Sequence, residues 1–235
     1  MLVHGRSDDR IASTLGELPG EARFYRADLA SLEQVRRLAA KVHEAEQRLD
    51  VLVNNAGIGT DVPGGGRRME SEDGYELRFA VNYLAGCLLT RELLPLLERS
   101  APAQIVNVSS AGQWPIDFDD VMLERQYSGV RAYCQSKLAQ VLHTIDLAER
   151  LDPARVTANC LHPATYMPTK IVPSPVSTLE EGVEATMRLV ADPELEGVSG
   201  HYFDGQREAA AESQAYDPDA RARLRELSER LVSAR

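Results

Sequence analysis

The stretch Leu49-Asp50-Val51-Leu52-Val53 runs directly into Asn54-Asn55-Ala56-Gly57. Its nearly continuous apolar character predicts a strand of a parallel sheet, because helices cover such a sheet on both faces. Polar residues and a glycine follow at the carboxyl end of the strand, which is the edge where open parallel sheets bind ligands. Gly57 has no side chain, so a ligand can approach the backbone closely there.

On both sides of this stretch, predicted strands alternate with predicted helices. The further strands are expected at 2–4, 22–29, 104–110, 156–161 and 201–203, and the helices at 32–48, 72–99, 129–151, 178–191 and 217–233. Alternation of this kind predicts an α/β fold with a parallel sheet. A chain of 235 residues suits a single domain spanning 1–235.

Three helix details can be predicted from the local sequence. Ser31 and Gln34 predict a capping box at the start of the 32–48 helix. Pro95 predicts that the 72–99 helix kinks or ends early. Alternating charges in the 217–233 helix indicate a solvent-exposed face.

Composition excludes several classes of partner. The net charge is -10, which argues against binding to nucleic acid or to an anionic membrane surface. No apolar run approaches the roughly 20 residues of a membrane span. The three cysteines have no disulfide or metal-ligand spacing, which indicates reduced thiols, no metal site and a cytoplasmic protein.

Tyr133 and Lys137 are candidates for acid/base chemistry. They lie four positions apart on a predicted helix, hence on one face. A free tyrosine has a pKa of ~10, and a neighbouring ammonium lowers it. The spacing alone also fits a half-buried Tyr beside a solvated Lys. Ser110 and His162-Pro163, each where a predicted strand ends, favour the catalytic interpretation.

Over nearly the whole chain, from His4 to about Leu231, the sequence resembles the short-chain dehydrogenase/reductase family. The resemblance rests on Asp28-Leu29, Asn54-Asn55-Ala56-Gly57, Asn82, Ser110, Tyr133 with Lys137, and Pro163. Ser199-Gly200-His201-Tyr202-Phe203, with Asp217 and the run at 228–231, resembles the branch that contains retinol-dehydrogenase-type enzymes.

The resemblance implies a Rossmann-like, doubly wound sheet and an NAD(P)-dependent enzyme that interconverts an alcohol and a carbonyl. Tyr133 would be the acid/base, and Ser110 would hydrogen-bond the developing oxyanion. Lys137 would lower the pKa of Tyr133 and hold the nicotinamide ribose, while Asn82 would anchor a water.

The resemblance also implies a set of cofactor contacts. Asp28, followed by Leu29, would bind the adenine amino group, and Asn54, Asn55, Ala56 and Gly57 would line the adenosine ribose. After Pro163, where Ala164 replaces the family's glycine, Thr169 fits the carboxamide contact better than Thr165. Arg6 can grip a phosphate, which favours NADP over NAD, although it also fits a surface Arg in a polar turn.

The largest departure from the family lies at the front of the chain. The family begins with a strand, a Gly-rich turn and a helix whose N-terminus receives the pyrophosphate. No such fingerprint lies upstream of residue 50. The first strand-turn-helix unit is therefore expected to be absent, and an upstream extension is expected to restore turnover. The alternative is a catalytically silent relative that acts as a binding or assembly module; an unrelated scaffold is a third interpretation.

The expected partners are a small-molecule alcohol or carbonyl and further copies of the chain. The loop residues Trp114, Phe118, Tyr127, Tyr166 and Met167 are candidates for an apolar substrate pocket. The helices at 72–99 and 129–151 carry more apolar positions than one covered face requires, which predicts a homo-oligomer.

Overall fold

The parallel strands form two separate sheets. The computed structural model describes residues 1–7, 16–18, 20–61, 63–64, 66–169, 172 and 174–233. Strand β1 (Leu2–Gly5) pairs in parallel with β2 (Arg23–Arg26). The larger sheet has the order β3 (Val51–Asn54), β4 (Ala103–Val108), β5 (Val156–His162), β6 (Tyr202–Asp204) and β7 (Arg207–Glu208), and only the β6–β7 pair is antiparallel. The predicted α/β fold with a Rossmann-like parallel sheet is confirmed.

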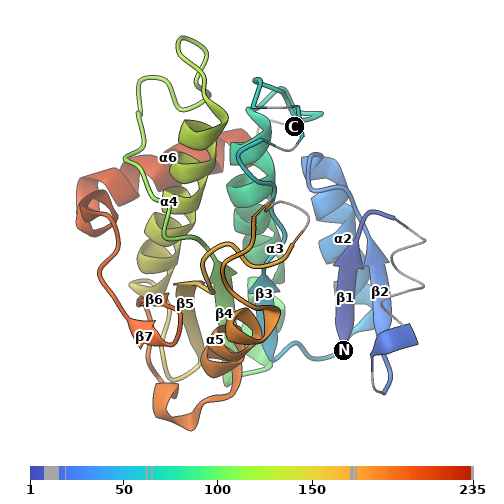
Figure 1. Cartoon of the computed structure of the whole chain (residues 1–235). Helices are drawn as coiled ribbons and strands as arrows, with labels where there is room; N and C mark the ends of the chain where they lie inside the picture. Colours follow the sequence, from blue (N-terminus) through green and yellow to red (C-terminus); the bar gives the residue numbers. More distant parts are fainter. Residues whose placement is uncertain are drawn as a thin grey trace.

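The boundary between the sheets lies between β1 and β3 (Figure 1). Within the described part of the chain, each of these strands pairs on one side only. Helices α2 (Leu32–Ala45) and α3 (Ala85–Arg99) bridge the boundary, because Tyr25, Leu38, Leu93 and Ile105 share one core cluster. The two sheets are thus separated between β1 and β3, and the predicted absence of a strand-turn-helix unit stays a prediction.

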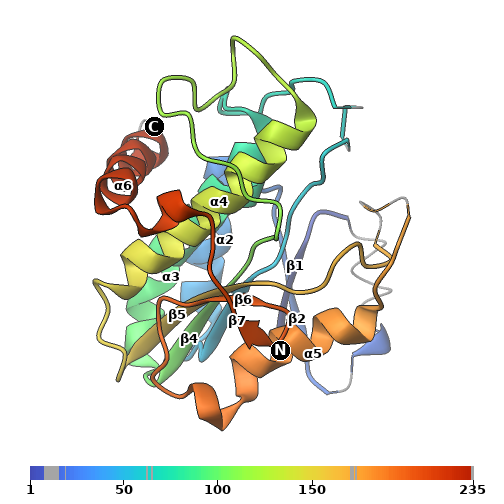
Figure 2. The ribbon, with the colours of Figure 1, turned by 60° about the vertical axis from the view of Figure 1, so that its left-hand side comes forward.

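Helices cover both faces of the larger sheet. Helix α4 (Gly129–Ala148) and α5 (Leu179–Ala191) lie on opposite faces (Figure 2). Helix α6 (Pro218–Ser233) packs on α4. The short helix η2 (Pro193–Leu195) joins α5 to β6, and the short helix η3 (Ser213–Tyr216) lies between β7 and α6 and contacts α4. None of the described helices combines the length and apolar character that crossing a bilayer requires.

One predicted helix start and one predicted capping box were wrong. The predicted 72–99 helix begins only at Leu77 and continues as a π-helical turn, η1 (Phe79–Leu84), because residues 71–76 form a tight turn. Ser31 makes no capping bond to α2. Instead, Asp73 accepts a hydrogen bond from the Leu32 N–H at 2.9 Å, and Gln34 accepts from the Asp28 N–H.

Of two other helix predictions, the early end at Pro95 was wrong and the exposed face of the last helix was right. Helix α3 continues through Pro95 to Arg99; Pro95 is exposed, so the carbonyl that loses its partner there can reach water. The predicted solvent-exposed face of α6 is confirmed, and the opposite face buries Leu224 and Val232 in the core. It covers apolar positions of α4 within the chain, so those positions do not require a second subunit.

Candidate active site

The four predicted catalytic side chains lie together beyond the carboxyl ends of β3 and β4. Tyr133 and Lys137 come from α4, Asn82 from η1, and Ser110 from just past β4. Two glycines show how close they are. A Cβ on Gly112 would lie 3.5 Å from Ser110 Oγ and 3.9 Å from Tyr133 Cε1. A Cβ on Gly57 would lie 3.2 Å from Asn82 Oδ1 and 3.6 Å from Lys137 Nζ.

Tyr133 differs in one respect from the sequence expectation. Burial raises the pKa of Tyr133, and the side-chain hydrogen bond with Ser110 lowers it by less. The expected lowering of this pKa by Lys137 is absent, because the Lys137 ammonium is directed elsewhere and lies 5.8 Å from the Tyr133 ring centroid. Tyr133 therefore keeps its proton at neutral pH, which suits a proton donor.

Lys137 points into the protein. Its ammonium donates to the Val108 carbonyl at 2.9 Å and to Gln140 Oε1 at 3.0 Å. Burial lowers the pKa of Lys137 to about 8, so the side chain is mostly charged at pH 7. Gln140 was missed in the sequence, although its position three residues after Lys137 on one helix places it on the same face.

Asn82 holds the segment that follows Gly57. Its Oδ1 accepts from the Ile58 N–H at 2.8 Å, and its Nδ2 donates to the Ile58 carbonyl and to Ser136 Oγ. The side chain is almost fully buried. Its predicted role in anchoring a water stays a prediction.

Arg6 and Asp28, two residues predicted to contact the adenosine end of the cofactor, lie close together in the fold. Their side chains are 3.6 Å apart and well exposed. Asp28 also accepts from the Ala30 N–H, and Leu29 packs against the core. Arg6 and Asp28 thus lie at one place, past the ends of β1 and β2.

The residues that follow β3 divide into two groups. The Asn54 amide donates to Thr90 Oγ1 at 3.0 Å and to Asn107 Oδ1 at 2.8 Å, so this side chain is directed toward α3 and β4. Asn55, Ala56 and Gly57 are exposed. Only this second group presents side chains or backbone to a ligand at the strand end.

Pro163 lines a cavity of about 670 Å³ with His162, Thr165 and Asp204. The Thr165 hydroxyl is 3.0 Å from His162 Nε2. Among the described residues, Thr169 has backbone hydrogen bonds with Met167 and Val172, and its predicted contact with the carboxamide stays a prediction.

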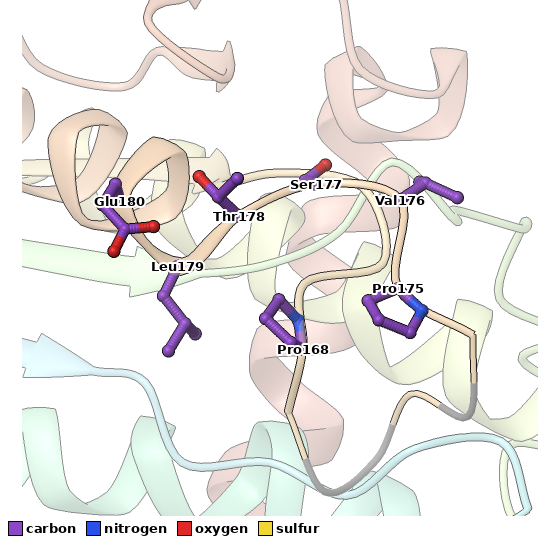
Figure 3. Close-up of a pocket in the computed structure, with 7 residues that line it drawn as sticks. All are labelled: Pro168, Pro175, Val176, Ser177, Thr178, Leu179 and Glu180. Carbon is purple, nitrogen blue, oxygen red and sulfur yellow. The ribbon is translucent and has the colours of Figure 1, made fainter.

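A second cavity, of about 480 Å³, lies between the loop after β5 and the start of α5 (Figure 3). Pro168, Val176 and Leu179 contribute apolar surface to it, and Ser177, Thr178 and Glu180 contribute polar groups. Val176 and Leu179 are largely exposed. Of the five aromatic and methionine residues predicted for an apolar pocket, none lines this cavity.

The residues at the site fit the nicotinamide half of a dinucleotide better than the other half. Gly57 leaves open the space beside Asn82 and Lys137 that a side chain would occupy. The described residues next to the β1–β3 boundary include no glycine turn that opens a helix, the feature that binds a pyrophosphate.

Comparisons with known proteins agree with this fold. The family model for short chain dehydrogenases matches residues 1–178. Human retinol dehydrogenase 13 is 41% identical over 228 residues, covering 87% of this chain and 67% of that protein. Human retinol dehydrogenase 14 is 38% identical over 250 residues, covering 97% and 73%. The chain belongs to the short-chain dehydrogenase/reductase family, a family of oxidoreductases with an NAD(P)-binding Rossmann fold, and to its retinol-dehydrogenase-like branch.

Solved structures share the fold. An uncharacterized protein from Mycobacterium paratuberculosis has a TM-score of 0.77 and 27% identity, covering 99% of this chain and 83% of that one. An NADPH-bound carbonyl reductase from chicken fatty liver has a TM-score of 0.67 and 21% identity, covering 89% and 86%. The second likeness concerns the fold alone.

Proposed function

We propose that the chain is an NADP-dependent oxidoreductase that interconverts an alcohol and a carbonyl by hydride transfer. The observation that carries this proposal is the proximity of Ser110 and Tyr133, because the Ser110 hydroxyl and the Tyr133 ring both lie within 4 Å of the place a Cβ on Gly112 would take, and the Lys137 ammonium is buried on the next turn of α4. Membership of an oxidoreductase family supports it.

The chain's own residues would transfer one proton to the substrate oxygen and stabilise the charge that develops on that oxygen. The nicotinamide, when bound, supplies or accepts the hydride. Tyr133, which burial keeps protonated, donates its proton to the substrate oxygen during reduction and accepts one from the alcohol in reverse. Ser110 donates a hydrogen bond to the same oxygen, and Lys137 would hold the ribose of the nicotinamide.

The choice of NADP rests on Arg6. Its exposed guanidinium, at the end of β1, can bind a phosphate in bidentate fashion. Asp28, 3.6 Å away, also fits a ribose or adenine contact, so NAD is the alternative. Replacing Arg6 by Ala should weaken NADPH binding more than NADH binding.

The proposed substrate is a small apolar alcohol or carbonyl compound. Trp114 and Tyr166 are exposed large side chains in the loops after β4 and β5. The names of the two human relatives make retinol and retinal the first compounds to test. We also propose a cytoplasmic location, which the free thiols of Cys87, Cys134 and Cys160 support.

The test is the oxidation of NADPH at 340 nm with retinal, together with calorimetry of NADPH binding. Turnover that needs both compounds supports the proposal. A catalytically silent binding or assembly module is a second candidate, and the interruption of the sheet between β1 and β3 favours it. If the protein binds no nicotinamide cofactor, the result would favour the binding or assembly module.

A further inference from the structure

Arg78 is an arginine with no exposed surface, located directly before η1. Its Nε donates to the Gly59 carbonyl at 2.7 Å, and its Nη2 donates to the carbonyls of Thr60 at 2.6 Å and Pro63 at 3.4 Å. Its Nη1 donates to the Tyr127 hydroxyl at 2.6 Å. One guanidinium therefore binds three carbonyls of one short loop and links them to a second loop.

The charge of Arg78 is balanced inside the protein. Glu76 is also buried, and its Oε1 lies 3.8 Å from Arg78 Nη1. Tyr127 donates to this same oxygen at 3.1 Å, while Glu76 Oε2 accepts from the Phe79 N–H at 2.7 Å. Because removing one partner leaves a buried charge unpaired, Arg78, Glu76 and Tyr127 form a unit.

This unit adjoins the candidate active site. Arg78 and Asn82 are four residues apart, and both bind the loop after β3, Asn82 at Ile58 and Arg78 from Gly59 onward. Gly57, the residue that faces Lys137, comes immediately before these contacts. On its other side the loop touches α4, because a Cβ on Gly129 would collide with the Thr60 carbonyl.

We propose that Arg78 is a positioning residue: with Glu76 and Tyr127 it fixes the Gly57–Asp61 segment, so that the open face of Gly57 stays beside Lys137. Arg78 has no part in proton transfer. The catalytic consequence rests on the proposed function, whereas the anchoring of the segment does not.

The first experiment measures the anchoring alone. Arg67 is exposed, and with Arg68 it offers trypsin a cleavage site just downstream of the segment. Arg78→Met should speed cleavage of the folded protein at these two sites about tenfold, and Tyr127→Phe should speed it less, because local opening governs such cleavage. Mass spectrometry of the fragments identifies the site.

The matched control is Arg221→Met. Arg221 is also buried, but it binds the Ala215 carbonyl and Glu149 and so holds α6. At a comparable loss of Tm, this variant should leave cleavage at Arg67 and Arg68 unchanged. Equal acceleration in the Arg78 and Arg221 variants would overturn the proposal. If Arg78→Met does not fold, Tyr127→Phe, which removes one oxygen atom, decides between the same two outcomes.

The second experiment measures the catalytic consequence. Tyr127→Phe should raise the KM for NADPH several-fold with kcat nearly retained, and Arg221→Met should leave the KM unchanged. Faster cleavage with an unchanged KM would overturn the positioning role. A wild-type protein without activity would refute the proposed function, and the cleavage rates would still decide whether Arg78 anchors the segment.

Discussion

The Lys137 ammonium and the Gln140 side-chain oxygen lie 3.0 Å apart, both inside the protein and one turn apart on α4. With the Val108 carbonyl at 2.9 Å, this contact holds the ammonium away from the Tyr133 hydroxyl. Both acceptors are neutral, so they compensate for only part of the lost hydration. Burial accordingly lowers the pKa of Lys137 to about 8.

Gln140→Leu should shift the alkaline limb of the pH–rate profile to lower pH. Without the Gln140 acceptor, the charged form of Lys137 is less stable, so its pKa falls further below the usual value. The free energy of unfolding should also fall by about 1–3 kcal/mol. Gln140→Glu is the opposing variant, because a carboxylate favours the ammonium and should move the limb to higher pH. Identical profiles for the two variants would refute this role of Gln140.

Tyr133→Phe should reduce kcat by about 10²–10⁴-fold, since it removes the proton donor. Ser110→Ala should reduce kcat by roughly 10²–10³-fold, because it removes one hydrogen bond to the developing oxyanion. Neither change should alter the affinity for NADPH, which calorimetry can measure. Retention of wild-type kcat in Tyr133→Phe would show that another group transfers the proton.

The protein should lose stability in mild acid because of His143. Burial lowers the pKa of His143 in α4 to about 4, and its ring lies edge-on to Tyr83 with centroids 6.0 Å apart. Below pH ~6.5 the unfolded chain binds a proton that the folded chain does not, so stability falls as pH decreases from about 6.5 to about 4. The expected loss is on the order of 1–3 kcal/mol, and above pH ~6.5 this histidine contributes no pH dependence.

Urea unfolding at pH 7.5 and pH 5 tests the contribution of His143. His143→Leu should show a smaller difference between the two pH values than the wild type. His43→Gln, at an exposed position of α2, should keep the full difference. The same difference in all three proteins would assign the acid sensitivity to other groups.

Adding a strand, a glycine turn and a helix of roughly 30 residues upstream of Met1 should raise both Tm and NADPH affinity. The new strand would pair with the edges of β1 and β3 that pair with no described strand, and the helix N-terminus would offer a pyrophosphate site. A flexible glycine-serine extension of equal length is the control. If the unextended chain binds NADPH as tightly as the extended form, the pyrophosphate site lies elsewhere.

The predicted homo-oligomer can be tested by light scattering at micromolar concentration. Helix α6 covers the α4 positions on which part of that prediction rested. A monomer would be explained by this internal cover. A stable oligomer would have to use other surfaces, such as the exposed Leu179, Val183 and Met187 of α5.

The sequence by itself determined the order of the strands and helices and the edge at which the site lies. Apolar periodicity and strand-end motifs are local signals, so Asn54–Gly57, Ser110 and the Tyr133–Lys137 pair could be located without coordinates. The predicted absence of the family's first strand-turn-helix unit rests on the linear order of the motifs and stays a prediction.

Only the tertiary structure decided which contacts these residues make. Asp73 caps α2 from 41 residues away, and Arg78 binds a loop and a tyrosine that no local pattern connects. The pKa of Tyr133 is raised because burial outweighs its polar neighbours. Burial and long-range hydrogen bonds depend on which segments the fold brings together, and the spacing of residues in one helix does not contain that information.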